Sequence, residues 1–134
     1  MSQIIKFKKL ILLSGKSNTG KTSILRELFD KSKIVINLNP KNRIERIGIC
    51  KIKNKNVAII SDGDAISVVK KRFNQLVKCK CKIDVVIIAC HPPFSNESID
   101  IYNMEYAFLV PKFGKYNGRT SDDTKVLKTI KALI

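Results

Sequence analysis

Several features of membrane-spanning, repetitive or multidomain proteins are missing from this sequence, which favours a compact cytoplasmic domain. Its 134 residues include no tryptophan and one histidine, and no apolar run reaches the roughly 18 residues that a membrane-spanning helix requires. Internal repeats, low-complexity tracts and linkers are absent as well. With 44% hydrophobic residues, a chain of this length can bury a sizeable core without disulfides or metals. We therefore expect one domain spanning residues 1–134, with no membrane segment.

A signal for export is not expected either. Basic residues and the short apolar run LILL near the N-terminus imitate a signal peptide, but they lead into a glycine-containing loop rather than a cleavage site. A cytoplasmic location follows, in which the cysteines are not expected to form disulfides. The four cysteines are Cys50, Cys79, Cys81 and Cys90.

The spacing of the cysteines does not favour zinc. Cys79 and Cys81 form a CxC pair, whereas structural zinc sites use CxxC pairs. Buried or incidental thiols are therefore the expectation. A metal site built on this pair, extended by Cys90 and His91, is the less favoured alternative.

Acidic residues are few, which leaves the chain strongly basic. Lysine and arginine total 26 against 11 aspartate and glutamate residues, giving a formal net charge of +15. Such a charge is typical of proteins that bind nucleic acids or other anions. However, 21 of the basic residues are lysines spread along the chain beside abundant isoleucine and asparagine, which an AT-rich coding sequence would also produce. No aromatic-rich single-strand-binding motif accompanies them. A nucleic acid or protein partner is therefore the second hypothesis.

Strand-like and helix-like segments alternate along the chain. The run VVIIAC at 85–90 is continuously apolar, as expected for a central parallel strand covered on both faces. Apolar residues at helical spacing indicate helices, and TSDD at 120–123 has the pattern of a capping box. The predicted strands are 8–14, 33–38, 47–53, 57–61, 85–90 and 106–110, and the predicted helices are 21–31, 64–78 and one after the capping box.

This alternation predicts the fold class. The runs 47–53 and 57–61 favour an antiparallel hairpin with its turn at 54–56, and 91–105 is expected to be a long connection. Strands that alternate with helices are typical of parallel sheets with right-handed crossovers. We expect an α/β three-layer sandwich, with a mainly parallel sheet and one antiparallel hairpin strand.

Between the first predicted strand and the first predicted helix lies GKSNTGKT, at residues 15–22. It matches the pattern G-x-x-x-x-G-K-[ST] in full, through Gly15, Gly20, Lys21 and Thr22. Glycine allows backbone angles that a side chain forbids, so the amides of such a loop can surround a phosphate. The helix that begins near Lys21 adds the partial positive charge of its N-terminus. The motif in this context predicts a site for nucleotide phosphates.

This stretch resembles the phosphate loop of the P-loop NTPase superfamily, and the strand–helix alternation extends the resemblance loosely to most of the chain. The resemblance implies a P-loop NTPase-like fold that binds ATP or another nucleoside triphosphate with Mg²⁺. It implies that Lys21 reaches the β- and γ-phosphates and that the Thr22 hydroxyl binds Mg²⁺. The residues implied to hold the nucleotide are Gly15, Lys16, Ser17, Asn18, Thr19, Gly20, Lys21, Thr22 and Ser23.

The resemblance also implies an acidic residue at the end of a neighbouring strand, on the metal side of the site. Asp62 is favoured because it comes first after the apolar run, and Asp64 is the alternative metal ligand. Each has an ordinary structural explanation as well. Asp62 precedes Gly63 in a common turn dipeptide, and Asp64 stands where a helix cap is expected.

Two further residues are candidates for catalysis. His91 directly follows the strand at 85–90 and would position a water or an acceptor hydroxyl, or accept a phosphoryl group. Arg119 lies in the basic segment 111–120, where with Lys112 and Lys115 it would form a short lid and stabilise transferred charge. The alternatives are a histidine held by the backbone at a proline turn, and an exposed basic loop.

The sequence does not assign a branch of the superfamily. The hairpin before Asp62 is like that of small GTPases, but the glycine of their D-x-x-G motif and their guanine-reading N-K-x-D motif are missing. ATP is therefore the default nucleotide. We expect a Mg²⁺-dependent ATP-binding protein that carries out NTP hydrolysis or small kinase-like phosphoryl transfer. The alternative is a nucleotide-responsive module that acts on a partner protein or nucleic acid with little catalysis, and oligomerisation could supply residues that so short a chain lacks.

Overall fold

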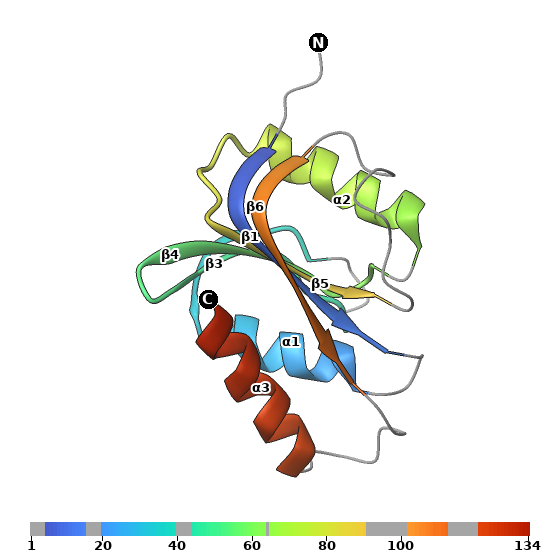
Figure 1. The fold of residues 1–134 in the computed structure, drawn as a ribbon. Helices are drawn as coiled ribbons and strands as arrows, with labels where there is room; N and C mark the ends of the chain where they lie inside the picture. The colour runs from blue at the N-terminus through green and yellow to red at the C-terminus, as the bar shows by residue number, and fades with distance from the viewer. Residues whose placement is uncertain (1–4, 16–19, 40–43, 64, 91–101, 113–120) are drawn as a thin grey trace.

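The computed structural model describes residues 5–15, 20–39, 44–63, 65–90, 102–112 and 121–134. Helices lie on both faces of a six-stranded sheet, with α2 on one face and α1 and α3 on the other (Figure 1). The elements, in chain order, are β1 (Ile5–Ser14), α1 (Lys21–Asp30), β2 (Lys33–Asn37), β3 (Ile47–Ile52), β4 (Lys55–Ile60), α2 (Ile66–Lys78), β5 (Val85–Cys90), β6 (Tyr102–Pro111) and α3 (Ser121–Leu133).

The sheet is mixed, and its strand order is β2-β3-β4-β5-β1-β6. β1 pairs in parallel with β5 and with β6, and β4 pairs in parallel with β5. β3 pairs in an antiparallel manner with both β2 and β4. The carboxyl ends of β1, β4, β5 and β6 therefore lie at one edge of the sheet, where ligands commonly bind in open α/β sheets.

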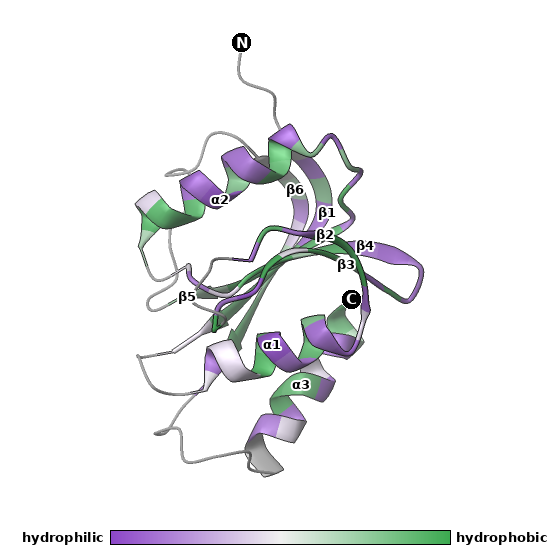
Figure 2. Ribbon diagram, turned by 180° about the vertical axis from the view of Figure 1, so that it is seen from behind, coloured by the Kyte–Doolittle hydropathy of each residue, from purple (hydrophilic) through white to green (hydrophobic). Residues whose placement is uncertain are grey.

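Two apolar cores hold the three layers together. The core on the α2 side includes Val69, Phe73 and Leu76 of α2, and the ring of Phe73 stacks on that of Phe7 with centroids 6.3 Å apart. The core on the other side includes Leu25 of α1 and Ile130 of α3. In Figure 2 the middle strands are coloured mainly hydrophobic, whereas the outer face of α2 is largely hydrophilic.

The α/β class and the layered arrangement are thus confirmed in the described part of the chain. β5 has the predicted bounds and is buried at all six positions, because both of its faces are covered. None of the helices in the described residues combines the length and apolar character needed to cross a bilayer.

The predicted turn at 54–56 starts one residue too late and ends two residues too late. β3 ends at Ile52 and pairs there with Lys55, which leaves a two-residue turn. Its two residues, Lys53 and Asn54, have positive φ angles of 54° and 62°. A turn with two positive φ angles matches the twist of the flanking strands, so the hairpin keeps this geometry although it lacks glycine.

The last strand begins earlier than predicted. β6 starts at Tyr102, which pairs with Ile5, so the expected connection 91–105 ends in strand residues. The polar residues at 103 and 105 hide this part of the strand from a search for apolar runs. β6 is an edge strand, and an edge strand tolerates such residues because part of it faces solvent.

Candidate functional site

The described residues of GKSNTGKT lie at the carboxyl edge of the parallel strands. β1 ends at Ser14, and the next residue, Gly15, donates its backbone N–H to the carbonyl of Cys90 at the end of β5 (3.1 Å). On the other side, the backbone N–H of Lys112 donates to the carbonyl of Ser14 (2.7 Å). The start of the loop is therefore fixed to both neighbouring strands.

Gly20 connects this loop to α1. Its φ of 93° and ψ of 13° are left-handed, a conformation that glycine adopts without the strain a Cβ would bring. As the N-cap of α1, it accepts a hydrogen bond from the backbone N–H of Ile24 (3.1 Å). No side chain caps this end, and the first turn contains no acidic residue. The positive end of the helix dipole therefore points toward the loop without a compensating carboxylate in that turn.

Lys21 is a buried cation at the start of α1. Its side chain is only 6% exposed, and its Nζ donates a hydrogen bond to the carbonyl of Gly15. The lysine thus bridges the first residue of the loop and the first residue of α1. Thr22 and Ser23 follow in the same turn and are half-buried. The residues between the two ends of the loop, Lys16–Thr19, lie outside the described residues.

Asp62 follows β4, as predicted, but its carboxylate is held by an arginine. Arg72 Nε lies 3.2 Å from Asp62 Oδ1 and 3.0 Å from Oδ2, and Arg72 Nη2 also donates to Oδ2. Arg72 Nη1 donates to Gln75 Oε1 at 3.0 Å, which orients the guanidinium within α2. Both charged side chains are largely buried, at 12% exposure for Arg72 and 18% for Asp62.

The position of Asp62 relative to the loop follows from the strand order. β5 lies between β4 and β1, so the ends of β4 and β1 are separated by two strand spacings, roughly 10 Å. The next residue, Gly63, packs closely on β5, since a Cβ there would lie 2.4 Å from a side-chain carbon of Ile88. Asp62 is therefore held at the carboxyl end of β4, and β5 separates it from the strand that leads into the loop.

Lys112, assigned from sequence to a basic lid, is instead buried. Its Nζ lies 3.1 Å from Asp123 Oδ1 in α3, and the two side chains are 6% and 5% exposed. The backbone N–H of Lys112 also donates to the carbonyl of Ser14, so Lys112 links the start of α3 to the end of β1. In the sequence, Asp123 is recognisable only as part of a capping box, and no local pattern indicates Lys112 as its partner.

Several predicted site residues are not among those that the structure describes. His91, Asp64, Arg119 and Lys115 lie outside the described residues, so their predicted roles stay predictions. Arg72 was missed, although an arginine in a helix whose other basic residues are lysines is a weak signal for bidentate pairing.

The four cysteines have no disulfide partner in the described structure. Burial raises the pKa of the Cys50 thiol to about 11, and the nearby Ser32 side chain opposes this with a smaller effect. Desolvation, and then the neighbouring Cys81, raise the pKa of Cys79. In the described part of the chain, no three histidine, cysteine or acidic side chains are grouped as a metal site would require. His91, the last residue of the cysteine-based metal alternative, lies outside the described residues, so that alternative stays a prediction.

Comparison with known protein families, with curated proteins and with solved structures found nothing that matches this chain.

Proposed function

We propose that this chain is a Mg²⁺-dependent, ATP-preferring P-loop protein whose Gly15–Ser23 segment binds the nucleotide phosphates. The observation that carries the proposal is the complete phosphate-loop motif between a buried strand and a helix, at the carboxyl edge of parallel strands. The left-handed Gly20 and the buried Lys21 beside it support the same conclusion.

Different groups of the chain would bind the phosphates and the Mg²⁺ ion. The uncapped first turn of α1 offers backbone N–H groups to the phosphates, and Lys21 exchanges its bond to the Gly15 carbonyl for a phosphate oxygen. Thr22 supplies a hydroxyl, an oxygen donor of the kind that Mg²⁺ prefers. The metal would neutralise charge on the β- and γ-phosphates during phosphoryl transfer or hydrolysis.

Asp62 would act on the metal side through a bound water, because one strand separates it from the loop. Its carboxylate must first leave the guanidinium of Arg72. This requirement favours a second candidate function, a nucleotide-responsive module that changes its contacts with a partner protein or nucleic acid and hydrolyses the nucleotide slowly or not at all.

A thermal-shift panel tests nucleotide binding. ATP, GTP and ADP are each added with and without Mg²⁺ to the wild type, to Lys21→Ala and to Lys71→Ala, which removes an exposed lysine of α2 as a matched control. Ligand at roughly 100 times its Kd should stabilise the fold by about 2.7 kcal/mol, a rise in Tm of roughly 5–10 °C. We expect a Mg²⁺-dependent shift with ATP that Lys21→Ala abolishes and Lys71→Ala retains.

The same panel can reject the proposal. The absence of a shift with any nucleotide would do so, as would a shift that survives in Lys21→Ala. If binding is confirmed, measurement of phosphate release then separates the two candidates. Multiple turnovers indicate an NTPase or phosphotransferase, and binding without turnover indicates the nucleotide-responsive module.

A further inference from the structure

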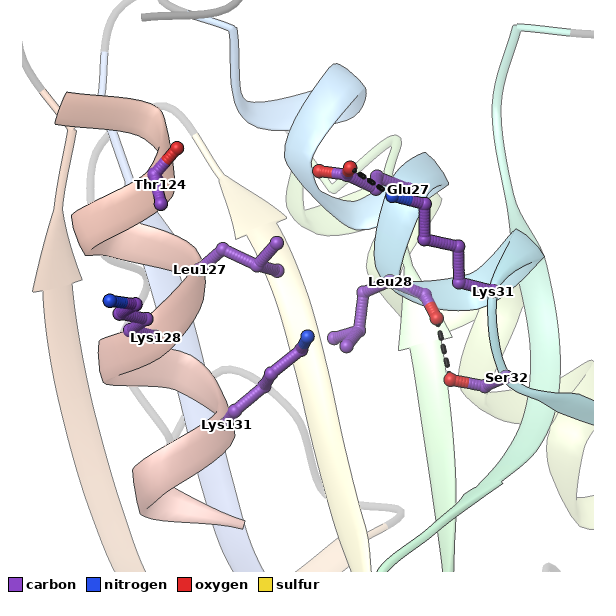
Figure 3. Close-up of a pocket in the computed structure, with 8 residues that line it drawn as sticks. All are labelled: Glu27, Leu28, Lys31, Ser32, Thr124, Leu127, Lys128 and Lys131. Atoms are coloured by element: carbon purple, nitrogen blue, oxygen red, sulfur yellow. Dashed lines mark hydrogen bonds and ion pairs between the residues drawn. The ribbon is translucent and has the colours of Figure 1, made fainter. Parts of the chain in front are cut away.

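The surface between α1 and α3 contains a groove of about 250 Å³. Leu28 of α1 and Leu127 of α3, both largely buried, point toward each other and form its apolar floor (Figure 3). Charged and hydroxyl-bearing side chains also line it. Lys131 extends from α3 toward α1, whereas Lys128 lies on the other side of α3 in this view. The lining residues are Glu27, Leu28, Lys31, Ser32, Thr124, Leu127, Lys128 and Lys131.

The groove is basic. Its lining includes three lysines and one glutamate, a formal net charge of +2. The glutamate, Glu27, is paired with Lys31 at 2.7 Å, but Lys31 is mostly exposed, and such surface pairs break at little cost. Among the residues that the structure describes, no carboxylate lies within ion-pair distance of Lys128 or Lys131. Two lysines three residues apart on one helix repel each other, so an anion between the helices would relieve that repulsion.

Further lysines surround the C-terminal end of α3, next to the groove. Lys53, in the β3–β4 turn, donates to the carbonyl of Lys131 (2.5 Å). Lys9 of β1 donates to the carbonyl of Leu133 (2.8 Å), and Lys55 of β4 donates to the backbone oxygen of Ile134 (2.7 Å). Desolvation lowers the pKa of Lys9, and the positive charges nearby, Lys55 first among them, lower it further. These three lysines therefore add positive charge beside the C-terminal end of α3.

We propose that the α1–α3 groove binds the phosphate backbone of a single-stranded nucleic acid. Lysine amines that line the groove contact phosphates without reading sequence. A groove of about 250 Å³ is too small to enclose a duplex, so it admits one strand.

This site is separate from the proposed nucleotide site. The phosphate loop precedes the N-terminus of α1, whereas the groove lies at the C-terminal end of that helix. A helix of ten residues is about 15 Å long, so the two sites do not share ligand-binding groups. Failure of either proposal leaves the other standing.

The test is fluorescence anisotropy with a labelled single-stranded DNA and an RNA of the same mixed sequence, at several salt concentrations. The groove variant is Lys128→Gln/Lys131→Gln. The matched control is Lys70→Gln/Lys71→Gln, which removes the same charge from exposed positions of α2 on the opposite face. A third variant, Glu27→Gln, removes the negative charge from the groove. Circular dichroism and Tm confirm that each variant is folded.

We expect the groove variant to bind both oligonucleotides about tenfold more weakly. Its plot of log K against log salt should be shallower by about 1.4, since each single-strand phosphate contact contributes roughly 0.7. The α2 control should stay within about twofold of the wild type, and Glu27→Gln should bind more tightly.

Three outcomes would overturn the proposal. The first is equal weakening by both double variants, which would indicate a diffuse effect of net charge. The second is loss of binding in Lys21→Ala but not in the groove variant, which would place the strand at the phosphate loop. The third is that the wild type binds neither oligonucleotide at low salt. Binding to phosphatidylserine vesicles instead would then indicate a lipid partner for the groove.

Discussion

Arg72 and Asp62 join α2 to the end of β4 through a bidentate ion pair, with Arg72 Nε 3.0 Å from Asp62 Oδ2. Arginine matches a carboxylate in both charge and shape, so this contact holds Asp62 in one orientation. A carboxylate held in this way is less available to a metal or to the water bound to it. The pair therefore stabilises the packing of α2 against the end of β4. In the proposed function it must also break before Asp62 can interact with the metal or its bound water.

Arg72→Gln should uncouple these two roles. It removes a charge-assisted interaction from a largely buried position, so we expect the free energy of unfolding to fall by about 1–3 kcal/mol. If Asp62 acts on the metal side, the same change should lower the Mg²⁺ concentration needed for half of the ATP-induced thermal shift. Lys71→Gln, on an exposed position of the same helix, is the control. An unchanged Mg²⁺ requirement in both Arg72→Gln and Asp62→Asn would remove Asp62 from the metal site.

Gly63→Ala tests how tightly the end of β4 is packed. A Cβ at this position would lie 2.4 Å from Ile88 Cγ2 and 2.7 Å from the carbonyl oxygen of Ala89. The carbonyl belongs to the central strand and cannot move away easily, so we expect a loss of about 1–3 kcal/mol in urea denaturation. Ser67→Ala, at an exposed position nearby, should change stability by less than about 0.5 kcal/mol. Equal stability of the two variants would contradict the close packing.

Cys50 should make the protein less stable at alkaline pH. Its folded pKa, about 11, lies above the ordinary value of 9.0. Between these pH values the unfolded chain loses the proton while the folded chain keeps it, so the stability present below pH 9 is lost as the pH rises. The full slope is about 1.4 kcal/mol per pH unit, which amounts to roughly 2–3 kcal/mol over the window.

The measurement is urea denaturation from pH 8 to pH 11 on the wild type and on Cys50→Ala. Lysine titration affects both proteins equally, so the difference between their slopes isolates the buried thiol. We expect Cys50→Ala to show the flatter dependence. Parallel curves would mean that the thiol ionises in the folded state as easily as in the unfolded chain.

The elements that were predicted from sequence are those defined by local patterns. β5 is a continuous apolar run, and its bounds were predicted as they occur because burial on both faces leaves no polar position. The first helix is marked by the phosphate-loop motif and by apolar spacing, and its predicted start at residue 21 is correct. The turn at Lys53–Asn54 was misplaced because neither residue carries the usual glycine signal for a positive φ.

The surroundings of the candidate site were predicted only in part, because much of them depends on contacts between distant residues. The strand order places β5 between β1 and β4, and no local pattern shows that arrangement. Arg72 pairs with Asp62 across a strand–helix junction, and the pairing is visible only once α2 has packed on the sheet. The motif GKSNTGKT can be found in the sequence alone, whereas the residues that surround it depend on the order of the strands and the packing of the helices.

The ion pair between Lys112 and Asp123 has the largest predicted effect on stability. Its two side chains are nearly inaccessible, and their charged atoms are 3.1 Å apart. Lys112→Met or Asp123→Leu alone removes this ion pair but keeps one of its two charges in a buried place, and we expect each to cost about 3–5 kcal/mol. The double variant Lys112→Met/Asp123→Leu removes both charges together and should recover most of that loss, because two apolar groups need no compensation.

Urea denaturation of the four proteins gives the coupling between the two residues through a double-mutant cycle. A double variant as unstable as the sum of the single variants would show that the two charges act independently, contrary to the geometry. Nucleotide binding offers a second measurement, since the backbone N–H of Lys112 donates to the carbonyl of Ser14 at the base of the loop. If the ion pair fixes that junction, the single variants should show a smaller ATP-induced thermal shift than Lys71→Ala, and the double variant should regain it as its stability returns.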